Sequence, residues 1–403
     1  MTQGSATVIL DLGNSETRGI VLYGKSQQTG RFLERSFTLS NRFSDVGEDY
    51  IPSSDYNDET STIMRINAMV DGAPFVGCFA NGELQLKEFN IAPLRPSATE
   101  KKYASMTTAL SYELAMLYAH RAVQGIARVS SLDSLDIDWN VVVLLPAGDV
   151  AEGSEKIVEL VKSVKKVDCV YPNVQIDLKV RRVSVLPEGF CAFVGTVFDK
   201  GNTVRQNMKE LLQQTTLIAD IGAGTTDFVI VKDNKIIQST MHTINRGGNN
   251  VTQLVKRAIR QNHNGLVLSE TDIIEGVENG FVMDGTRKID ISGYINDAQD
   301  EIARFLVSDI QSYFEETEFP ARSIARLLVC GGGCISSEAA GTKALSETLV
   351  TYFKRLSPYI ELIELPSRVE CHTDDEGIMH REIRNISPRH LNVIGASILA
   401  EMI

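Results

Sequence analysis

One motif occurs twice in this chain, and this repeat constrains the fold more than any other feature. Residues 8–21 read VILDLGNSETRGIV, and residues 217–230 read LIADIGAGTTDFVI. In each copy an apolar strand ends in an aspartate, a turn of glycine and small residues follows, and a second apolar strand begins. Internal similarity over so long a separation predicts two related domains. Three pairs of residues coincide when the copies are aligned: Asp11 with Asp220, Gly13 with Gly222, and Thr17 with Thr226.

The chemistry of the repeated turn suits a phosphate group. Backbone N–H groups of a short turn can converge on an anion, and glycine lets the anion approach without a Cβ in the way. The hydroxyl groups of Ser15, Thr225 and Thr226 add further donors. The two aspartates would repel a polyphosphate unless a hydrated Mg²⁺ lay between them and the phosphate oxygens. The alternative is that both copies are ordinary β-hairpins. A single copy would favour that alternative, whereas two copies in one register favour a pair of turns that clamp a polyphosphate.

Two other glycine-rich segments fit the same ligand. The segment 246–249 reads RGGN and precedes a helical pattern, so its backbone amides can meet a phosphate or a ribose at the N-terminus of a helix. The segment 327–334 reads LLVCGGGC; a buried strand that ends in glycines lets a flat group pack against bare backbone. In both places the alternative is a tight turn that binds no ligand.

Composition and charge exclude several classes of protein. The 403 residues carry a net charge of −12, which disfavours binding to bare DNA because that requires clustered Lys and Arg. No apolar run approaches the roughly 18–20 residues that span a bilayer, and the polar start does not resemble a signal peptide. Six scattered cysteines fit reduced thiols in a cytosol. We expect no zinc site at Cys330 and Cys334, and we expect Cys371 and His372 to lie in a loop.

Periodicity predicts strands that alternate with helices, which indicates α/β layers. The polar stretch 200–214 is expected to separate two domains, and 44–61 is expected to be a surface loop. Strand segments are predicted at 6–10, 17–23, 30–43, 63–70, 74–79, 139–145, 174–185, 217–231, 325–329 and 360–365. Helices are predicted at 105–123, 152–165, 249–261, 269–278, 295–314, 337–356 and 387–402.

The ordered set of motifs resembles the superfamily of actin, sugar kinases and heat-shock-chaperone ATPases. Within it, the chain is most similar to the bacterial ParM and StbA actins, which segregate plasmids. The segments 141–150 (VVVLLPAGDV), 185–193 (VLPEGFCAF) and 392–395 carry this closer resemblance. The motifs of the superfamily match, in chain order, Asp11-Leu12-Gly13, Pro187-Glu188, Asp220-Ile221-Gly222, Gly247-Gly248 and Gly331-Gly332-Gly333.

The resemblance implies an α/β fold of the actin-like, duplicated ribonuclease H-like type, with two domains around a nucleotide cleft. Domain I would comprise residues 1–200, with an insertion near 30–100 and with the C-terminal helix 387–403 packed back on it. Domain II would comprise residues 201–386.

The resemblance also implies roles for individual residues. Asp11 and Asp220 would hold Mg²⁺ through water, and Glu188 would orient or deprotonate the attacking water. Arg18 stands where actins have a phosphate-contacting lysine, and Asp227 would join the water network. The implied nucleotide-binding residues are Gly13, Asn14, Ser15, Arg18, Gly222, Ala223, Gly224, Thr225, Thr226, Gly247, Gly248, Asn249, Gly331, Gly332 and Gly333.

The implied cofactors are ATP and Mg²⁺, with GTP as the alternative nucleotide. The implied function is that of a cytoplasmic filament-forming ATPase that drives plasmid DNA segregation. It would assemble with itself and with a ParR-like DNA-binding adaptor, without touching DNA or a membrane directly. Two alternatives stay open. One is a small-molecule kinase or phosphatase of the same superfold, although no sugar-binding wall is evident. The other is a non-segregation actin-like cytoskeletal protein, although neither terminus is basic and amphipathic.

Overall fold

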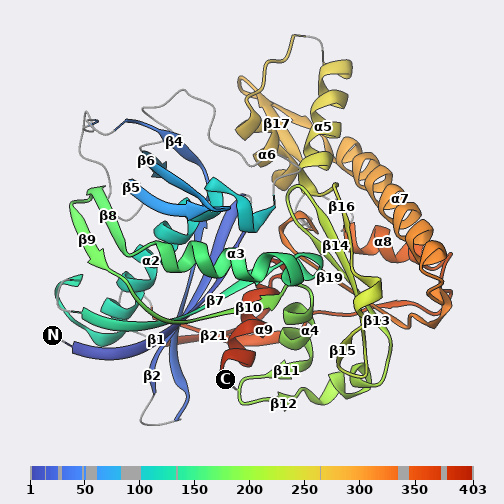
Figure 1. Ribbon diagram of the computed structural model, residues 1–403. Helices are drawn as coiled ribbons and strands as arrows, with labels where there is room; N and C mark the ends of the chain where they lie inside the picture. Colours follow the sequence, from blue (N-terminus) through green and yellow to red (C-terminus); the bar gives the residue numbers. More distant parts are fainter. Residues whose placement is uncertain are drawn as a thin grey trace. The chain divides into compact units, whose positions relative to one another are not determined.

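The computed structural model divides the chain into two compact units (Figure 1). Unit 1 comprises Met1–Cys191 with Ala396–Ile403, and unit 2 comprises Ala192–Gly395. The chain passes between them inside two helices, α4 (Phe190–Val197) and α9 (Leu391–Ala400). The domain limits inferred above, with their boundary at residue 200, stay a prediction. The structure describes residues 2–13, 15–25, 30–47, 50, 61–82, 101–132, 135–263, 265–334, 345–373 and 379–401.

A five-stranded sheet carries the first copy of the motif in unit 1. Its strand order is β10-β7-β1-β2-β3. The central strand β1 pairs in parallel with β7 and antiparallel with β2. Val8, Ile9 and Leu10 are fully buried in succession, which explains why β1 is apolar on both faces instead of alternating. The strands are β1 (Thr2–Leu12), β2 (Glu16–Lys25), β3 (Phe32–Ser40), β7 (Leu135–Leu145) and β10 (Lys179–Pro187).

A second sheet of unit 1 has the strand order β4-β6-β5-β8-β9. The predicted hairpin between β5 and β6 is present, and Asp71 and Gly72 at its tip both have positive φ, 47° and 76°. Two positive φ values in a two-residue turn match the twist of the flanking strands. The strands are β4 (Phe43–Asp45), β5 (Ser61–Val70), β6 (Ala73–Gly82), β8 (Lys166–Tyr171) and β9 (Val174–Asp177).

Two helices, α2 (Met106–Ala127) and α3 (Val150–Ser163), each pack against strands of both sheets. The apolar spacing predicted α2 as amphipathic. In the structure every residue of 107–117 is buried, because the helix is covered on two sides. This double cover buries the carboxylate of Glu113 as well. The helix therefore exists where it was predicted, but without the solvent-facing stripe that such a pattern usually indicates.

Unit 2 is built around a sheet of order β15-β14-β13-β19-β20, with β16 also paired to β14. Helix α7 packs against α5 and α8, and its apolar residues Ile302 and Leu306 join the core of the unit. The strands are β13 (Thr216–Ile221), β14 (Thr226–Lys232), β15 (Lys235–Ile236), β16 (His242–Ile244), β19 (Arg326–Cys330) and β20 (Glu361–Leu362). The helices are α5 (Gly248–Asn262), α6 (Glu270–Asn279), α7 (Ser292–Glu316) and α8 (Leu345–Phe353).

None of the described helices is both long and apolar enough to cross a membrane. Short ladders and 3₁₀ turns complete the described part of the chain. Three two-stranded ladders join β11 (Phe198–Asp199) to β12 (Thr203–Val204), β17 (Phe281–Asp284) to β18 (Arg287–Asp290), and β21 (Ser367–Thr373) to β22 (Met379–Asn385). The 3₁₀ turns are η1 (Lys102–Ala104), η3 (Ala147–Asp149), η4 (Gln206–Leu212), η5 (Gln238–Thr240), η6 (Ala321–Ser323), η7 (Gly332–Cys334) and η9 (Pro388–His390).

The structure corrects two of the predicted elements. Residues 174–185 were expected to form one strand, but the chain leaves one sheet and enters the other at Leu178, whose N–H donates to the carbonyl of Lys165 (2.8 Å). Alternation along a sequence does not reveal which partner a strand will choose, so the break is invisible there. Cys371 and His372 were expected in a loop, and they lie in β21 because β22 supplies a pairing partner. The predicted helix 337–356 begins at Leu345 in the structure; residues 335–344 lie outside the described ranges.

Candidate functional site

The two copies of the repeated motif form β-hairpins of the same register. In each unit the strand that ends in aspartate pairs antiparallel with the strand after the turn. The same strand also pairs in parallel with a later one, β7 in unit 1 and β19 in unit 2. The repeat in the sequence is therefore a repeat in the structure. The equivalent cross-strand pairs are Asp11–Arg18 and Leu12–Thr17 in unit 1, and Asp220–Asp227 and Ile221–Thr226 in unit 2.

The first turn is fastened from outside by Asn41. Its side-chain amide donates to the carbonyl of Gly13, and its backbone N–H donates to the carbonyl of Ser15 (3.0 Å). Thr17, which is fully buried, donates its hydroxyl to the Asn41 side chain (2.9 Å). A Cβ on Gly13 would lie 2.7 Å from the carbonyl oxygen of Glu16, so the turn requires glycine there. Asn14, an implied nucleotide-binding residue, lies outside the described residues.

A buried lysine joins the two implied catalytic carboxylates of unit 1. Lys102 Nζ lies 3.2 Å from Asp11 Oδ1 and 2.5 Å from Glu188 Oε1. Asp11 is 5% exposed and Glu188 is 7% exposed. Glu188 reaches this place because it follows the end of β10, where its N–H donates to the carbonyl of Leu145 (2.7 Å). A carboxylate in β1 and a carboxylate just after β10 thus share one ammonium group.

Arg18 adds a second cation to Asp11. The register places it directly opposite Asp11, and its guanidinium lies 3.6 Å from Asp11 Oδ2 and 2.7 Å from Glu16 Oε2. Burial alone would raise the pKa of Asp11, but Lys102 and Arg18 hold that pKa below its ordinary value. Burial likewise opposes the charge on Lys102, yet Glu188 and Asp11 together raise the pKa of Lys102 above its usual range. Asp11 and Lys102 are therefore both charged at neutral pH.

The neighbours of Lys102 explain how it is held in place. It begins η1, and the ring of the next residue, Tyr103, is buried against α3 where Gly153 leaves room for it. Lys156 of the same helix lies over that ring, 5.2 Å from its centroid. Sequence reasoning missed Lys102. A lysine pair followed by a tyrosine before an amphipathic helix resembles a solvated helix start, and nothing local indicates that the second lysine turns inward.

In unit 2 the three glycine-rich segments predicted to share a ligand come together. The N–H of Gly248 donates to the carbonyl of Gly222 (3.0 Å), and the N–H of Asn249 donates to that of Ala223 (2.8 Å). A Cβ on Gly247 or Gly333 would lie 2.5 Å or 2.6 Å from the Gly222 carbonyl oxygen. Close backbone packing therefore requires these glycines, and the amides of 248 and 249 anchor the start of α5 to the second turn.

Asp220 lies at the centre of this cluster. It is 6% exposed, and Oδ2 accepts a hydrogen bond from the side-chain amide of Asn392 (2.6 Å). Gly331 has a φ of +91°, and a Cβ there would lie 2.5 Å from Asp220 Oδ1. Its N–H donates to the carbonyl of Pro388 (3.2 Å). The glycines after β19 and the segment that leads into α9 thus surround the second aspartate.

The remaining predicted residues of unit 2 take up separate positions. Thr226 is fully buried and donates its hydroxyl to the carbonyl of Arg246 (2.7 Å), as Thr17 does to Asn41 in the first hairpin. Asp227 accepts from the hydroxyl of Thr243 on the neighbouring strand β16. Thr225 closes the turn through its carbonyl, which accepts from the N–H of Gly222 (2.8 Å). Gly224 lies within this turn, and Gly332 lies in η7.

The donor set fits a hydrated metal that is carried on phosphate. Carboxylate oxygens are the ligands that Mg²⁺ prefers, but Lys102 and Arg18 already balance the charge of Asp11. Among the residues that the structure describes, no group of three or more His, Cys, Asp or Glu side chains is placed to hold a metal ion. A carboxylate such as Asp11, whose charge is already balanced by cations, suits contact with a metal through the water that the metal carries.

Comparison with known proteins identifies the fold. Residues 218–339, all within unit 2, match the family model of the archaeal MreB-like actin homologue, C-terminal domain. No curated protein matches the chain. Among solved structures, the actin-like protein Alp7A is similar with a TM-score of 0.64 and 14% identity, over 100% of this chain and 97% of that chain.

Two further similar structures show a protein with a bound nucleotide and a protein assembled in a filament. The archaeal actin homologue Ta0583 in complex with ADP has a TM-score of 0.61 and 14% identity, over 99% of this chain and 100% of that chain. A 15-stranded ParM filament from Clostridium botulinum has a TM-score of 0.58 and 15% identity, over 99% of each chain. The α/β, actin-like fold class that the sequence predicted is confirmed. The chain thus has the fold of the actin-like superfamily, and its residues 218–339 match the C-terminal domain of MreB-like actin homologues.

Proposed function

We propose that this chain is a filament-forming ATPase that binds Mg²⁺·ATP, with GTP as the alternative nucleotide. The observation that carries the proposal is the repeated hairpin: each unit presents one buried aspartate at the head of a tight glycine turn, in identical register. Structures of the same fold include an ADP complex of an archaeal actin homologue and a filament of a ParM protein.

The residues of this chain would then have the following roles. When bound, Mg²⁺ and the nucleotide would supply a metal-polarised phosphoryl group that water can attack. Asp11 and Asp220 would accept hydrogen bonds from water on the metal. Glu188, which lies beside the protonated Lys102, would orient the attacking water and accept its proton. The turns at Gly13–Ser15 and Gly222–Thr226, the start of α5 at Gly247–Asn249, the glycines Gly331–Gly333 and Arg18 would contact the nucleotide.

We further propose that the filament moves plasmid DNA in the cytoplasm through a ParR-like adaptor that binds the DNA. The net charge of −12 supports an adaptor, because it disfavours direct contact with nucleic acid. Cys78, Cys169, Cys191 and Cys330 are buried thiols, which is compatible with a reducing compartment.

Nucleotide-dependent sedimentation tests the proposal. We expect the purified chain to scatter light and to pellet when Mg²⁺ and ATP are added, and to stay in the supernatant with EDTA. GTP in place of ATP identifies the preferred nucleotide. A chain that never pellets over a wide range of protein concentration and with either nucleotide would refute the filament.

The variant Glu188→Gln separates assembly from hydrolysis. Because glutamine keeps the shape of Glu188 but cannot take a proton, we expect phosphate release to fall by roughly 10²–10⁴-fold, while nucleotide binding and pelleting persist. Glu155→Gln on the exposed side of α3 is the matched control and should hydrolyse at the parent rate. Unchanged phosphate release in Glu188→Gln would remove this residue from the catalytic role.

A further inference from the structure

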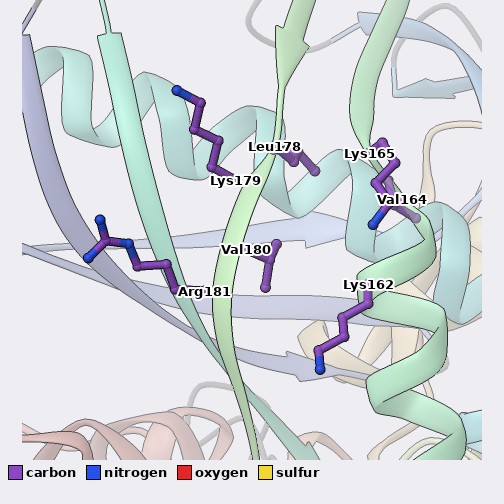
Figure 2. Close-up of a pocket in the computed structure, with 7 residues that line it drawn as sticks. All are labelled: Lys162, Val164, Lys165, Leu178, Lys179, Val180 and Arg181. Carbon is purple, nitrogen blue, oxygen red and sulfur yellow. The ribbon is translucent and has the colours of Figure 1, made fainter.

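A cavity of about 240 Å³ in unit 1 is lined mainly by cations. It lies where α3 ends and β10 begins (Figure 2). The hydrogen bond from the N–H of Leu178 to the carbonyl of Lys165 joins its two walls (2.8 Å). Four cationic side chains, Lys162, Lys165, Lys179 and Arg181, and three apolar ones, Val164, Leu178 and Val180, line this cationic pocket.

Two of the four cations are already balanced. Lys179 Nζ lies 2.6 Å from Asp136, and Arg181 lies 2.5 Å from Asp138. These two belong to β10, an edge strand of the sheet, where basic residues commonly serve to block pairing with another strand. That explanation does not extend to Lys162 and Lys165, which lie at and just beyond the end of α3.

Lys162 and Lys165 are exposed, and within the described ranges neither has an ion pair or a hydrogen bond through its ammonium group. Lys162 complements the negative end of the α3 dipole, but one cation is enough for that purpose. In a chain of net charge −12, a hollow with two uncompensated lysines above an apolar floor attracts a carboxylate-bearing polypeptide segment. A cavity of about 240 Å³ suits a side-chain carboxylate better than an extended nucleic-acid backbone.

Unit 2 carries a cluster of acidic side chains whose negative charge is not balanced by ion pairs among the described residues. Glu315, Glu316 and Glu318 are all exposed at the end of α7. The last turn of this 25-residue helix contains no basic residue, so the glutamates add negative charge to the negative end of the helix dipole, which is unfavourable. Among the described residues none of the three makes an ion pair, and Glu315 only accepts a hydrogen bond from Gln311 (2.9 Å).

We propose that Glu315–Glu318 of one copy docks in the cationic pocket of the next copy. The proposal rests on the proposed self-assembly and names a surface that it uses. Each element supplies the charge that the other lacks. Because the two surfaces differ, the contact is head-to-tail, and a head-to-tail contact that does not close into a ring repeats into a filament.

Zero-length cross-linking tests the contact directly in the full-length chain. A carbodiimide joins a lysine to a carboxylate only where the two touch. Chains labelled with ¹⁵N and unlabelled chains are mixed, so that mass spectrometry separates links between copies from links within one copy. We expect mixed-isotope peptides that join Lys162 or Lys165 to Glu315, Glu316 or Glu318. Absence of these peptides, while other links between copies form, would overturn the proposal.

Charge reversal provides an independent test by sedimentation. Lys162→Glu with Lys165→Glu, and separately Glu316→Lys with Glu318→Lys, should each raise the protein concentration needed for assembly by about tenfold or more, because like charges then face each other. All four changes in one chain should restore assembly. Lys162→Gln with Lys165→Gln removes the positive charges without reversing them. This variant should also weaken assembly, and it tests the contact if the reversed charges unfold the end of α3. Lys232→Glu with Lys235→Glu, at the exposed β14–β15 turn, alters net charge equally and should assemble like the parent.

The outcomes separate this contact from the proposed function. If the parent chain does not pellet with nucleotide, the proposed function fails, and cross-linking at high protein concentration still decides whether the two surfaces meet. If only the lysine variants are impaired and the glutamate variants assemble normally, the occupant of the pocket is something other than α7, such as nucleic acid or another protein. That result overturns the proposal, as does normal assembly in both sets.

Discussion

A single buried lysine governs the charge of the first hairpin. Lys102 compensates both Asp11 and Glu188, and its side chain is only 13% exposed. Removing one partner of a buried ion pair is far more costly than removing a surface pair, because the remaining charge loses its counterion in a place that water does not reach. Here the loss would remove this ammonium group from Glu188 and leave Asp11 with Arg18 as its remaining cation.

We therefore expect Lys102→Met to destabilise the chain by roughly 3–5 kcal/mol. Lys101→Met is the matched control, since Lys101 pairs with Asp149 at 2.6 Å but is 49% exposed, and exposed pairs contribute about 0–1 kcal/mol. Urea unfolding followed by circular dichroism measures both. Equal effects of the two variants would show that Lys102 is not a buried counterion.

Glu113 poses the opposite problem, since it is a buried acid with little to stabilise its charge. It is fully buried on α2; one oxygen accepts the N–H of Asp168 (3.2 Å), and the other has no hydrogen-bond partner in the part of the chain that the structure describes. Burial raises the pKa of Glu113 from 4.5 to about 8. The folded state therefore holds a proton that the unfolded state releases between these pH values.

This linkage predicts a stability that falls as the pH rises from about 4.5 to about 8, because the native state binds more protons than the unfolded state in this window. Glu113→Gln should remove that part of the pH dependence and should stabilise the chain most, relative to the parent, at pH 8 and above. Burial lowers the pKa of His120 to about 4, so His120 makes the stability rise with pH instead of fall. A His120→Gln control should therefore not remove the fall in stability between pH 4.5 and pH 8. Urea titrations at several pH values test this, and parallel curves for Glu113→Gln and the parent would contradict it.

At the scale of elements, the second hairpin is held by glycines that let three loops touch. Gly331 combines a left-handed φ of +91° with backbone and carboxylate atoms where a Cβ would be. An alanine there is strained by its φ and would also displace Ile221 or Asp220. The effect should reach the second turn itself, because that turn is packed against these glycines.

Gly331→Ala should weaken nucleotide binding by at least about tenfold and lower the thermal stability of the chain by several degrees. Gly293→Ala is the control, because a Cβ at Gly293 in the first turn of α7 meets no atom within 4 Å. Fluorescence titration with a labelled nucleotide and a thermal melt supply the two readouts. Parent-like binding in Gly331→Ala would mean that the packing of this loop does not shape the nucleotide site.

At the scale of the whole molecule, each unit has its own hydrophobic core and its own copy of the hairpin. A ligand that binds only the folded chain stabilises it by mass action, by about 2.7 kcal/mol at a hundredfold excess over Kd. We expect Mg²⁺·ATP to raise Tm accordingly, and EDTA to reduce the shift.

Asp220→Asn should largely abolish this Mg²⁺-dependent rise in Tm. The amide oxygen can still accept the hydrogen bond from Asn392, so the fold is retained while the charge that attracts the hydrated metal is lost. Asp284→Asn, an exposed acid of the same unit, serves as control. A full Tm shift in Asp220→Asn would remove Asp220 from the proposed metal site.

Several features could be predicted from the sequence because they depend on short-range pattern. The two hairpins, the parallel strands β7 and β19, and the long helices α2 and α7 follow from apolar periodicity, and the turn at Gly13 follows from local sterics. The α/β class follows from the alternation of strands and helices, the equivalence of Asp11 and Asp220 follows from aligning the two copies of the motif, and the actin-like class was implied by the resemblance of the ordered motifs.

Only the tertiary structure placed Lys102 between Asp11 and Glu188, Asn392 against Asp220, and Gly248 against Gly222. It also ended one strand at Leu178 and began another in a different sheet. These contacts join residues that are far apart in the chain, and a polar residue looks the same in sequence whether it faces water or a buried carboxylate. The repeated hairpin is formed by neighbouring residues and can therefore be recognised in the sequence. The groups that neutralise and support it come from distant parts of the chain and are brought there by tertiary packing.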